Sequence, residues 1–132
     1  HHTSKLASFA DLAAVQTLGF RGEALSSLCG VATLSMVTST AATAPKGTTL
    51  SFTSAGACVP EKKVARERGT TVKVERLFEH LPVRRNELVK NAQRELGKAL
   101  ALLQAHALVN TGVRFEARNV TKGCVAPTSV CI

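Results

Sequence analysis

The sequence predicts an α+β fold, and three observations lead to this class. Apolar residues recur at helical spacing near the start of the chain and again in its second half. Between these stretches, apolar and polar residues alternate in the pattern of half-buried strands. Short segments rich in glycine, proline and threonine join the alternating runs, so consecutive strands are expected to form an antiparallel sheet. A length of 132 residues favours one compact domain or a piece of a larger one.

Two short helices are predicted before the strands. Ser8 is a favourable capping residue, and Asp11 three positions later can complete the cap, so the first helix is expected to run through Ala14. The second helix is predicted over residues 21–29, where apolar residues gather on one face, and Gly30 should end it.

Four strands are predicted next, from the alternation at residues 32–36, 49–53, around Val59 and 71–75. Pro60 indicates that the third of them lies at a sheet edge, because proline has no N–H to donate to a neighbouring strand. Residues 41–47 and the charged segment 61–69 are predicted as connecting loops.

The pattern changes again at Leu81-Pro82, which we interpret as a boundary. An apolar stripe then predicts one long helix over residues 85–109, followed by a stop at 110–112. A further strand is expected to begin at 113–117, and another at 130–132.

Composition and charge exclude several classes of protein. No stretch approaches the roughly 18 to 20 apolar residues of a membrane span. The four cysteines lack the spacing of metal ligands, so we expect reduced thiols and a reducing compartment. The net charge is +8, and residues 61–98 contribute eleven basic and six acidic side chains to it. A basic segment of this kind favours nonspecific binding of polyanions, although a solvated helix face would look the same.

The strongest local motif is the run Gly19-Phe20-Arg21-Gly22-Glu23-Ala24-Leu25. Its glycines let the backbone approach an anion closely, and the free N–H groups of the following helix turn favour phosphate. Arg21 can add a charge-assisted contact. The alternative is a tight turn with an ordinary helix cap.

Two weaker polar clusters are His2-Thr3-Ser4-Lys5 and Gly69-Thr70-Thr71-Val72. The first can hold phosphate oxygens or be a plain loop, and the second can be an ordinary β-branched strand. The sequence shows no nucleophile beside a base and few carboxylates at phosphate-site spacing. An independent metal-dependent hydrolase is therefore not expected.

Taken together, these clusters and the run Leu81-Pro82-Val83-Arg84-Arg85 resemble the MutL family of DNA mismatch-repair proteins, and RGEALSSLC at 21–29 resembles its eukaryotic PMS-type subunit. The resemblance implies part of a GHKL (Bergerat-type) α/β sandwich with an antiparallel-rich sheet. Residues 1–80 would be the C-terminal portion of that ATPase domain, and 81–132 the beginning of a transducer-like α+β domain.

The resemblance also implies the roles of the site residues. Thr3, Ser4 and Lys5 would belong to a lid that closes on ATP, the run 19–25 would offer N–H groups to the triphosphate, and Thr70 would lie near the adenine. The family's general-base glutamate, its Mg²⁺-binding asparagine and its Asp-x-Gly-x-Gly loop have no counterpart in these residues. We therefore expect weak binding of ATP with Mg²⁺ at most, and no turnover by this chain alone.

For the parent protein the resemblance implies a nuclear ATPase switch that dimerises with an MLH-type subunit and carries its endonuclease site in another domain. The basic segment fits nonspecific contact with double-stranded DNA, for which the candidates are Arg84, Arg85, Lys90 and Arg94. An exposed apolar sheet face would let the chain self-associate. Two alternatives remain: a basic α+β nucleic-acid-binding module without nucleotide chemistry, and another GHKL enzyme such as a type II topoisomerase subunit.

Overall fold

The computed structural model describes residues 6, 8–15, 17, 19, 22–121 and 124–126, with side chains up to residue 120. The chain divides into two compact units, His1–Arg85 and Asn86–Ile132. The expected boundary after residue 80 remains a prediction.

The first unit begins with two short helical segments. A 3₁₀ helix, η1, spans Phe9–Ala14, and the Ser8 backbone N–H donates a hydrogen bond of 2.7 Å to Asp11 Oδ2. The predicted cap pair is thus present, although the helix is 3₁₀ rather than α.

The α-helix α1 spans Ala24–Cys29, so the expected start at residue 21 was wrong for the described residues. Gly22 has φ +71°, a left-handed conformation that a right-handed helix excludes, and the helix therefore starts after it. Gly30 ends α1 as predicted, and its N–H bonds Ser26 O at 3.3 Å.

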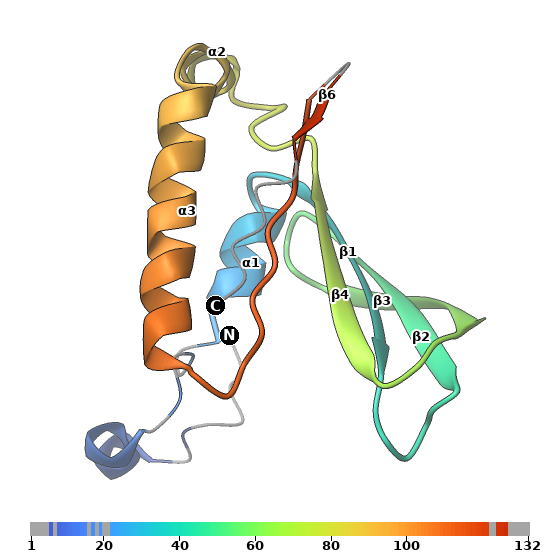
Figure 1. Ribbon diagram of the computed structural model, residues 1–132. Helices are drawn as coiled ribbons and strands as arrows, with labels where there is room; N and C mark the ends of the chain where they lie inside the picture. The colour runs from blue at the N-terminus through green and yellow to red at the C-terminus, as the bar shows by residue number, and fades with distance from the viewer. Residues whose placement is uncertain are drawn as a thin grey trace. The chain divides into compact units, whose positions relative to one another are not determined.

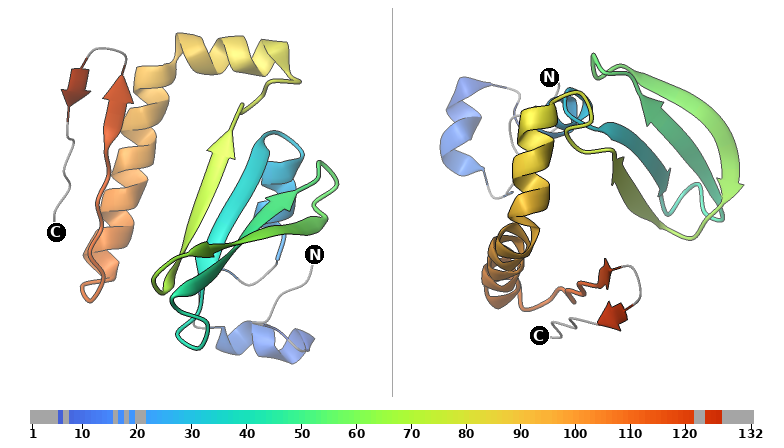
Figure 2. Two further views of the ribbon diagram at one scale, coloured as in Figure 1. Left: turned by 90° about the vertical axis from the view of Figure 1, so that its right-hand side faces the viewer. Right: turned by 90° about the horizontal axis from the view of Figure 1, so that it is seen from above.

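Four strands form one antiparallel sheet in the order β3-β2-β1-β4 (Figure 1), which confirms the predicted antiparallel sheet. β4 pairs with β1 and not with β3, its neighbour in sequence. Their bounds are Thr33–Ser39 for β1, Lys46–Phe52 for β2, Cys58–Ala65 for β3 and Gly69–Glu75 for β4. Figure 2 shows the four strands side by side in a twisted sheet, as the backbone sterics of L-residues favour. The loop predicted at 41–47 ends earlier, because Lys46 and Gly47 already pair with β3.

The charged segment 61–69 is not a loop throughout, since β3 continues through it to Ala65. Pro60 lies opposite Leu50 and Lys62 opposite Thr49, so Glu61 is an extra residue in a β-bulge. As predicted, the strand that contains Pro60 is an edge strand. At an edge, charged side chains reach water while the backbone pairs on one side, and charge alone is therefore a poor signal for a loop.

One face of the sheet is apolar. Residues opposite each other in a sheet share a face, and the register places Leu34, Met36, Leu50, Val72 and Val74 together. Leu34 is only 1% exposed, and α1 lies against its strand. Val72 and Val74 on β4 are 44% and 41% exposed, so this face is covered over only part of its area.

The predicted long helix is two helices. α2 spans Pro82–Lys90, across the boundary between the units, and α3 spans Ala92–Val109. Asn91 separates them with φ −109° and ψ 14°. Its side-chain Nδ2 and its backbone N–H both donate to Glu87 O, at 3.0 and 3.1 Å. Such local side-chain bonding competes with helix continuation.

After α3, Val113 N–H bonds Asn110 O in a turn, and residues 114–118 have no regular structure, so the strand predicted at 113–117 was wrong. Instead, β5 (Asn119–Thr121) pairs with β6 (Cys124–Ala126) in an antiparallel ribbon. The strand predicted at 130–132 lies outside the described residues. Among the described helices, none has the length and apolarity to cross a membrane.

Candidate functional site

Some of the predicted site residues lie outside the part of the chain that the structure describes. These are Thr3, Ser4, Lys5, Phe20 and Arg21. Gly19, Gly22, Glu23, Ala24, Leu25 and Thr70 are described, and all of them belong to the first unit.

The described residues of the glycine motif lie before and at the start of α1. Gly22 adopts φ +71°, which side chains rarely tolerate, and a Cβ at Gly19 would meet open space. Glu23 precedes the helix, and its carbonyl accepts a bond of 2.8 Å from Ser27 N–H. Because α1 has only six residues, its dipole is weak support for anion binding. The left-handed turn at Gly22 is the stronger observation.

Thr70 lies at the start of β4, in a row of polar side chains that crosses the sheet. Lys63, Thr48, Thr38 and Thr70 are opposite one another on successive strands, and we call them the polar row. Lys63 Nζ donates to Thr48 Oγ1 at 2.8 Å. The Thr38 and Thr70 hydroxyls are 2.7 Å apart in a hydrogen bond that either can donate. The polar row continues the same face as Met36 and Val72.

The corner beside Thr70 is held by Arg66. Its backbone N–H bonds Pro45 O at 2.8 Å, and its Nε bonds Gly69 O at 3.2 Å. Arg66 therefore connects the ends of β3 and β4 with the turn before β2. It also lies against Gly47, where an added Cβ would be 2.9 Å from Arg66 Cβ and 3.1 Å from Thr38 O.

Sequence reasoning missed Thr38 and Ser39. Ser39 is 6% exposed, and its Oγ donates to Lys46 O at 3.2 Å, so it closes the turn between β1 and β2. The alternation in β1 carried a signal for Thr38, because it assigns this hydroxyl to the face of Leu34 and Met36. Its partner 32 positions away cannot be read from local pattern.

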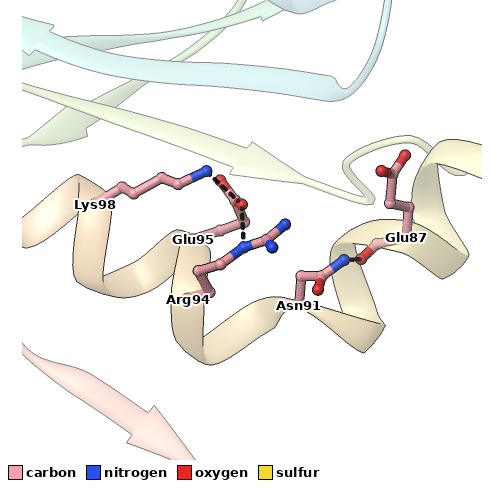
Figure 3. Close-up of polar contacts among 5 residues, drawn as sticks. All are labelled: Glu87, Asn91, Arg94, Glu95 and Lys98. Atoms are coloured by element: carbon pink, nitrogen blue, oxygen red, sulfur yellow. Dashed lines mark hydrogen bonds and ion pairs between the residues drawn. The ribbon is translucent and has the colours of Figure 1, made fainter.

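The candidate DNA-contacting residues are all exposed. Arg84, Arg85 and Lys90 lie on α2 and form no ion pair within the described part of the chain. Arg94 on α3 is 3.3 Å from Glu95 Oε1, which also accepts a bond of 2.9 Å from Lys98 (Figure 3). The Lys98 hydrogen bond holds the pKa of the Glu95 carboxyl below its ordinary value. Part of the charge on Arg94 is thus neutralised locally.

The described residues contain no group of three or more His, Cys, Asp or Glu side chains that could hold a metal ion. Cys29 and Cys58, the cysteines whose side chains are described, are free thiols.

The known proteins that are similar to this chain include DNA-repair proteins. No protein-family model matches the chain. The DNA mismatch repair protein PMS1 of Saccharomyces cerevisiae is 46% identical over 121 residues, which are 92% of this chain and 14% of that protein. PMS1 of Arabidopsis thaliana is 50% identical over 121 residues, 92% of this chain and 13% of that protein. The chain thus spans about one seventh of the length of these curated relatives.

A crystal structure of the N-terminal domain of a DNA repair protein has a similar fold, with a TM-score of 0.75 and 40% sequence identity. The match covers 88% of this chain and 34% of that one. This likeness and the observed sheet and helices confirm the predicted α+β class as part of a GHKL-like N-terminal domain.

Proposed function

We propose that this chain, which belongs to the MutL family of DNA mismatch-repair proteins, acts in mismatch repair as a segment of an ATP-binding region. The left-handed conformation of Gly22 carries this proposal, because it lets the backbone approach an anion closely at a position where a side chain would be strained. The homology supports it across about nine tenths of the chain.

Each part of the motif set has a proposed task. The amides of residues 19–25 bind the triphosphate, and Thr70 contacts the base end of the nucleotide. The segment Thr3-Ser4-Lys5 closes over the phosphates. Bound ATP would supply a phosphoanhydride bond whose cleavage resets the conformation of the parent protein. The described residues contain no group of three or more carboxylate, histidine or cysteine side chains that could form a Mg²⁺ site by themselves.

The chain alone should bind ATP weakly and not hydrolyse it. The general-base glutamate that the family resemblance implies has no counterpart in these residues, and positioning of phosphate alone does not replace a general base. The test is a titration of the purified chain with Mg-ATP, followed by nuclear magnetic resonance shifts and by phosphate release. We expect saturable shifts without turnover. Turnover comparable to that of a full-length relative would contradict the second expectation, and absence of binding would contradict the nucleotide role.

The same titration separates this proposal from the second candidate, a basic nucleic-acid-binding module without nucleotide chemistry. That candidate draws support from the charge of +8 and from the exposed Arg84, Arg85 and Lys90. It predicts DNA binding with no response to ATP, since phosphate backbones need no glycine turn.

We propose that nonspecific contact with double-stranded DNA accompanies nucleotide binding. Affinity should fall linearly on a log–log plot against salt, with a slope of about −0.9 for each neutralised phosphate. Reversal of Arg84 and Arg85 to Glu should flatten this slope and weaken binding. Reversal of Arg114 and Arg118, which changes the net charge equally, is the matched control. Binding that does not depend on salt would contradict the electrostatic account.

In a longer parent protein we further propose a heterodimer with an MLH-type subunit and a nuclear location, in keeping with mismatch repair. The exposed Val72 and Val74 support self-association of the isolated chain. Sedimentation at increasing concentration tests this last point, and a clean monomer throughout would contradict it.

A further inference from the structure

The polar row ends at Thr70, and the last link in it is a contact between two side-chain hydroxyls. Thr38 on β1 and Thr70 on β4 are directly opposite in the register, and their Oγ1 atoms are 2.7 Å apart. Both side chains are β-branched, with few χ1 rotamers available in a strand. The pair is therefore held by the sheet and by the hydrogen bond together.

This contact limits what the Thr70 hydroxyl can do. A hydroxyl has one hydrogen to donate and two lone pairs that accept. The hydrogen bond to Thr38 restricts rotation of the Thr70 hydroxyl, and it therefore limits the directions in which this hydroxyl can bond a second partner. This restriction lowers the entropic cost of a hydrogen bond to a ligand, because the side chain is already ordered before binding.

We infer that Thr38 is a positioning residue of the nucleotide site, acting through its 2.7 Å hydrogen bond to Thr70. The inference rests on the proposed function, in which Thr70 contacts the base end of ATP. Thr38 itself does not touch the ligand. Its task is to hold the Thr70 hydroxyl in the orientation that binds.

The polar row provides a matched control for this inference. Thr48 on β2 is also opposite Thr38, on the other side, and its hydroxyl accepts from Lys63 Nζ at 2.8 Å. Thr48→Val and Thr38→Val therefore remove the same group from neighbouring strands on the same face of the sheet. Only Thr38→Val takes a partner away from Thr70.

The experiment titrates the 132-residue chain and its variants with ATP and, separately, with inorganic tripolyphosphate. We expect Thr38→Val to weaken ATP binding about three- to tenfold, the usual worth of one hydrogen bond. Thr38→Ser, which keeps the hydroxyl, should restore most of the affinity. Thr48→Val should leave ATP binding unchanged, and tripolyphosphate binding should be the same in all variants, because Thr70 is assigned to the base end.

A double-mutant cycle shows whether Thr38 acts through Thr70. Thr38→Val should have no further effect when it is added to Thr70→Val. Independent effects of the two substitutions would overturn the inference, as would equal losses from Thr38→Val and Thr48→Val. A wild-type chain that does not bind ATP would overturn the proposed function and this inference with it. ATP binding that tolerates Thr38→Val would overturn the inference alone.

Discussion

The corner between Gly47 and Arg66 allows a sharp test of how the sheet is packed. Gly47 is buried, and a Cβ added there would be 2.9 Å from Arg66 Cβ and 3.1 Å from Thr38 O. Neither neighbour can move easily. Arg66 is held by hydrogen bonds from its backbone N–H and its Nε, and Thr38 O belongs to the backbone of a paired strand. Substitution of Gly47 by alanine therefore requires a shift of the strands themselves.

The magnitude follows from two opposing effects. Overpacking of a tight site destabilises the folded state by about 1–3 kcal/mol. Replacing a strand glycine by alanine stabilises it by roughly 0.5–1 kcal/mol, because alanine loses less conformational entropy on folding. Because the 2.9 Å approach to Arg66 Cβ is closer than real Cβ contacts, we take the upper part of the overpacking range, about 2–3 kcal/mol. We therefore expect Gly47→Ala to destabilise the first unit by about 1–2 kcal/mol, or roughly 4–16 °C in Tm for a unit of this size. Urea denaturation followed by circular dichroism measures the change.

Gly30→Ala is the matched control in the same unit. Gly30 has φ −71° and ψ −17°, and an added Cβ would make an ordinary contact of 3.5 Å with Ser27 O. Alanine at Gly30 should leave the stability unchanged or raise it slightly. A Gly47→Ala variant as stable as the wild-type chain would refute the packing argument, since it would mean that Arg66 and Thr38 can yield without cost.

Three further predictions concern single positions. Gly22→Ala should lower stability by roughly 1–2 kcal/mol in denaturant titrations, because its φ of +71° is costly for a residue with a Cβ. Gly97→Ala should raise the stability of α3 by roughly 1 kcal/mol in the same assay, since its Cβ would meet open space in a helix. The pKa of the Glu95 carboxyl is lowered from 4.5, chiefly by its hydrogen bond to Lys98. The ionised carboxylate therefore stabilises the fold fully above pH 4.5, and this contribution is lost as the pH falls through the folded-state pKa. Lys98→Ala should move the Glu95 titration, measured by nuclear magnetic resonance, back towards 4.5.

Local patterns predicted the secondary structure where local chemistry decides it. The strands β1, β2 and β4 follow from alternation, and the end of α1 follows from Gly30. The prediction failed for two segments. The charged residues after Pro60 continue a strand because β2, a separate strand, pairs with them. The helix after Pro82 is interrupted for a local reason that the apolar stripe does not show, since the Asn91 side chain bonds Glu87 O four positions earlier.

The candidate site divides in the same way. The glycine motif and Thr70 were found from sequence because they form short runs of adjacent residues, and the structure adds the left-handed conformation of Gly22. Thr38 was not found, since nothing near it in the chain marks it as Thr70's partner. The role of both hydroxyls in binding stays a prediction that the titrations address.

The order of residues along the chain was enough to establish the α+β class and the antiparallel sheet, because both depend on the spacing of neighbouring residues. It also established the kinship with mismatch-repair proteins, because several short runs occur together along the chain. The tertiary structure decided which distant groups meet: Arg66 against Gly47, the length of β3, and the hydroxyl pair of Thr38 and Thr70. Those contacts depend on strand register. A shift of one residue would send every side chain of a strand to the opposite face, and no local pattern encodes the partner across the sheet.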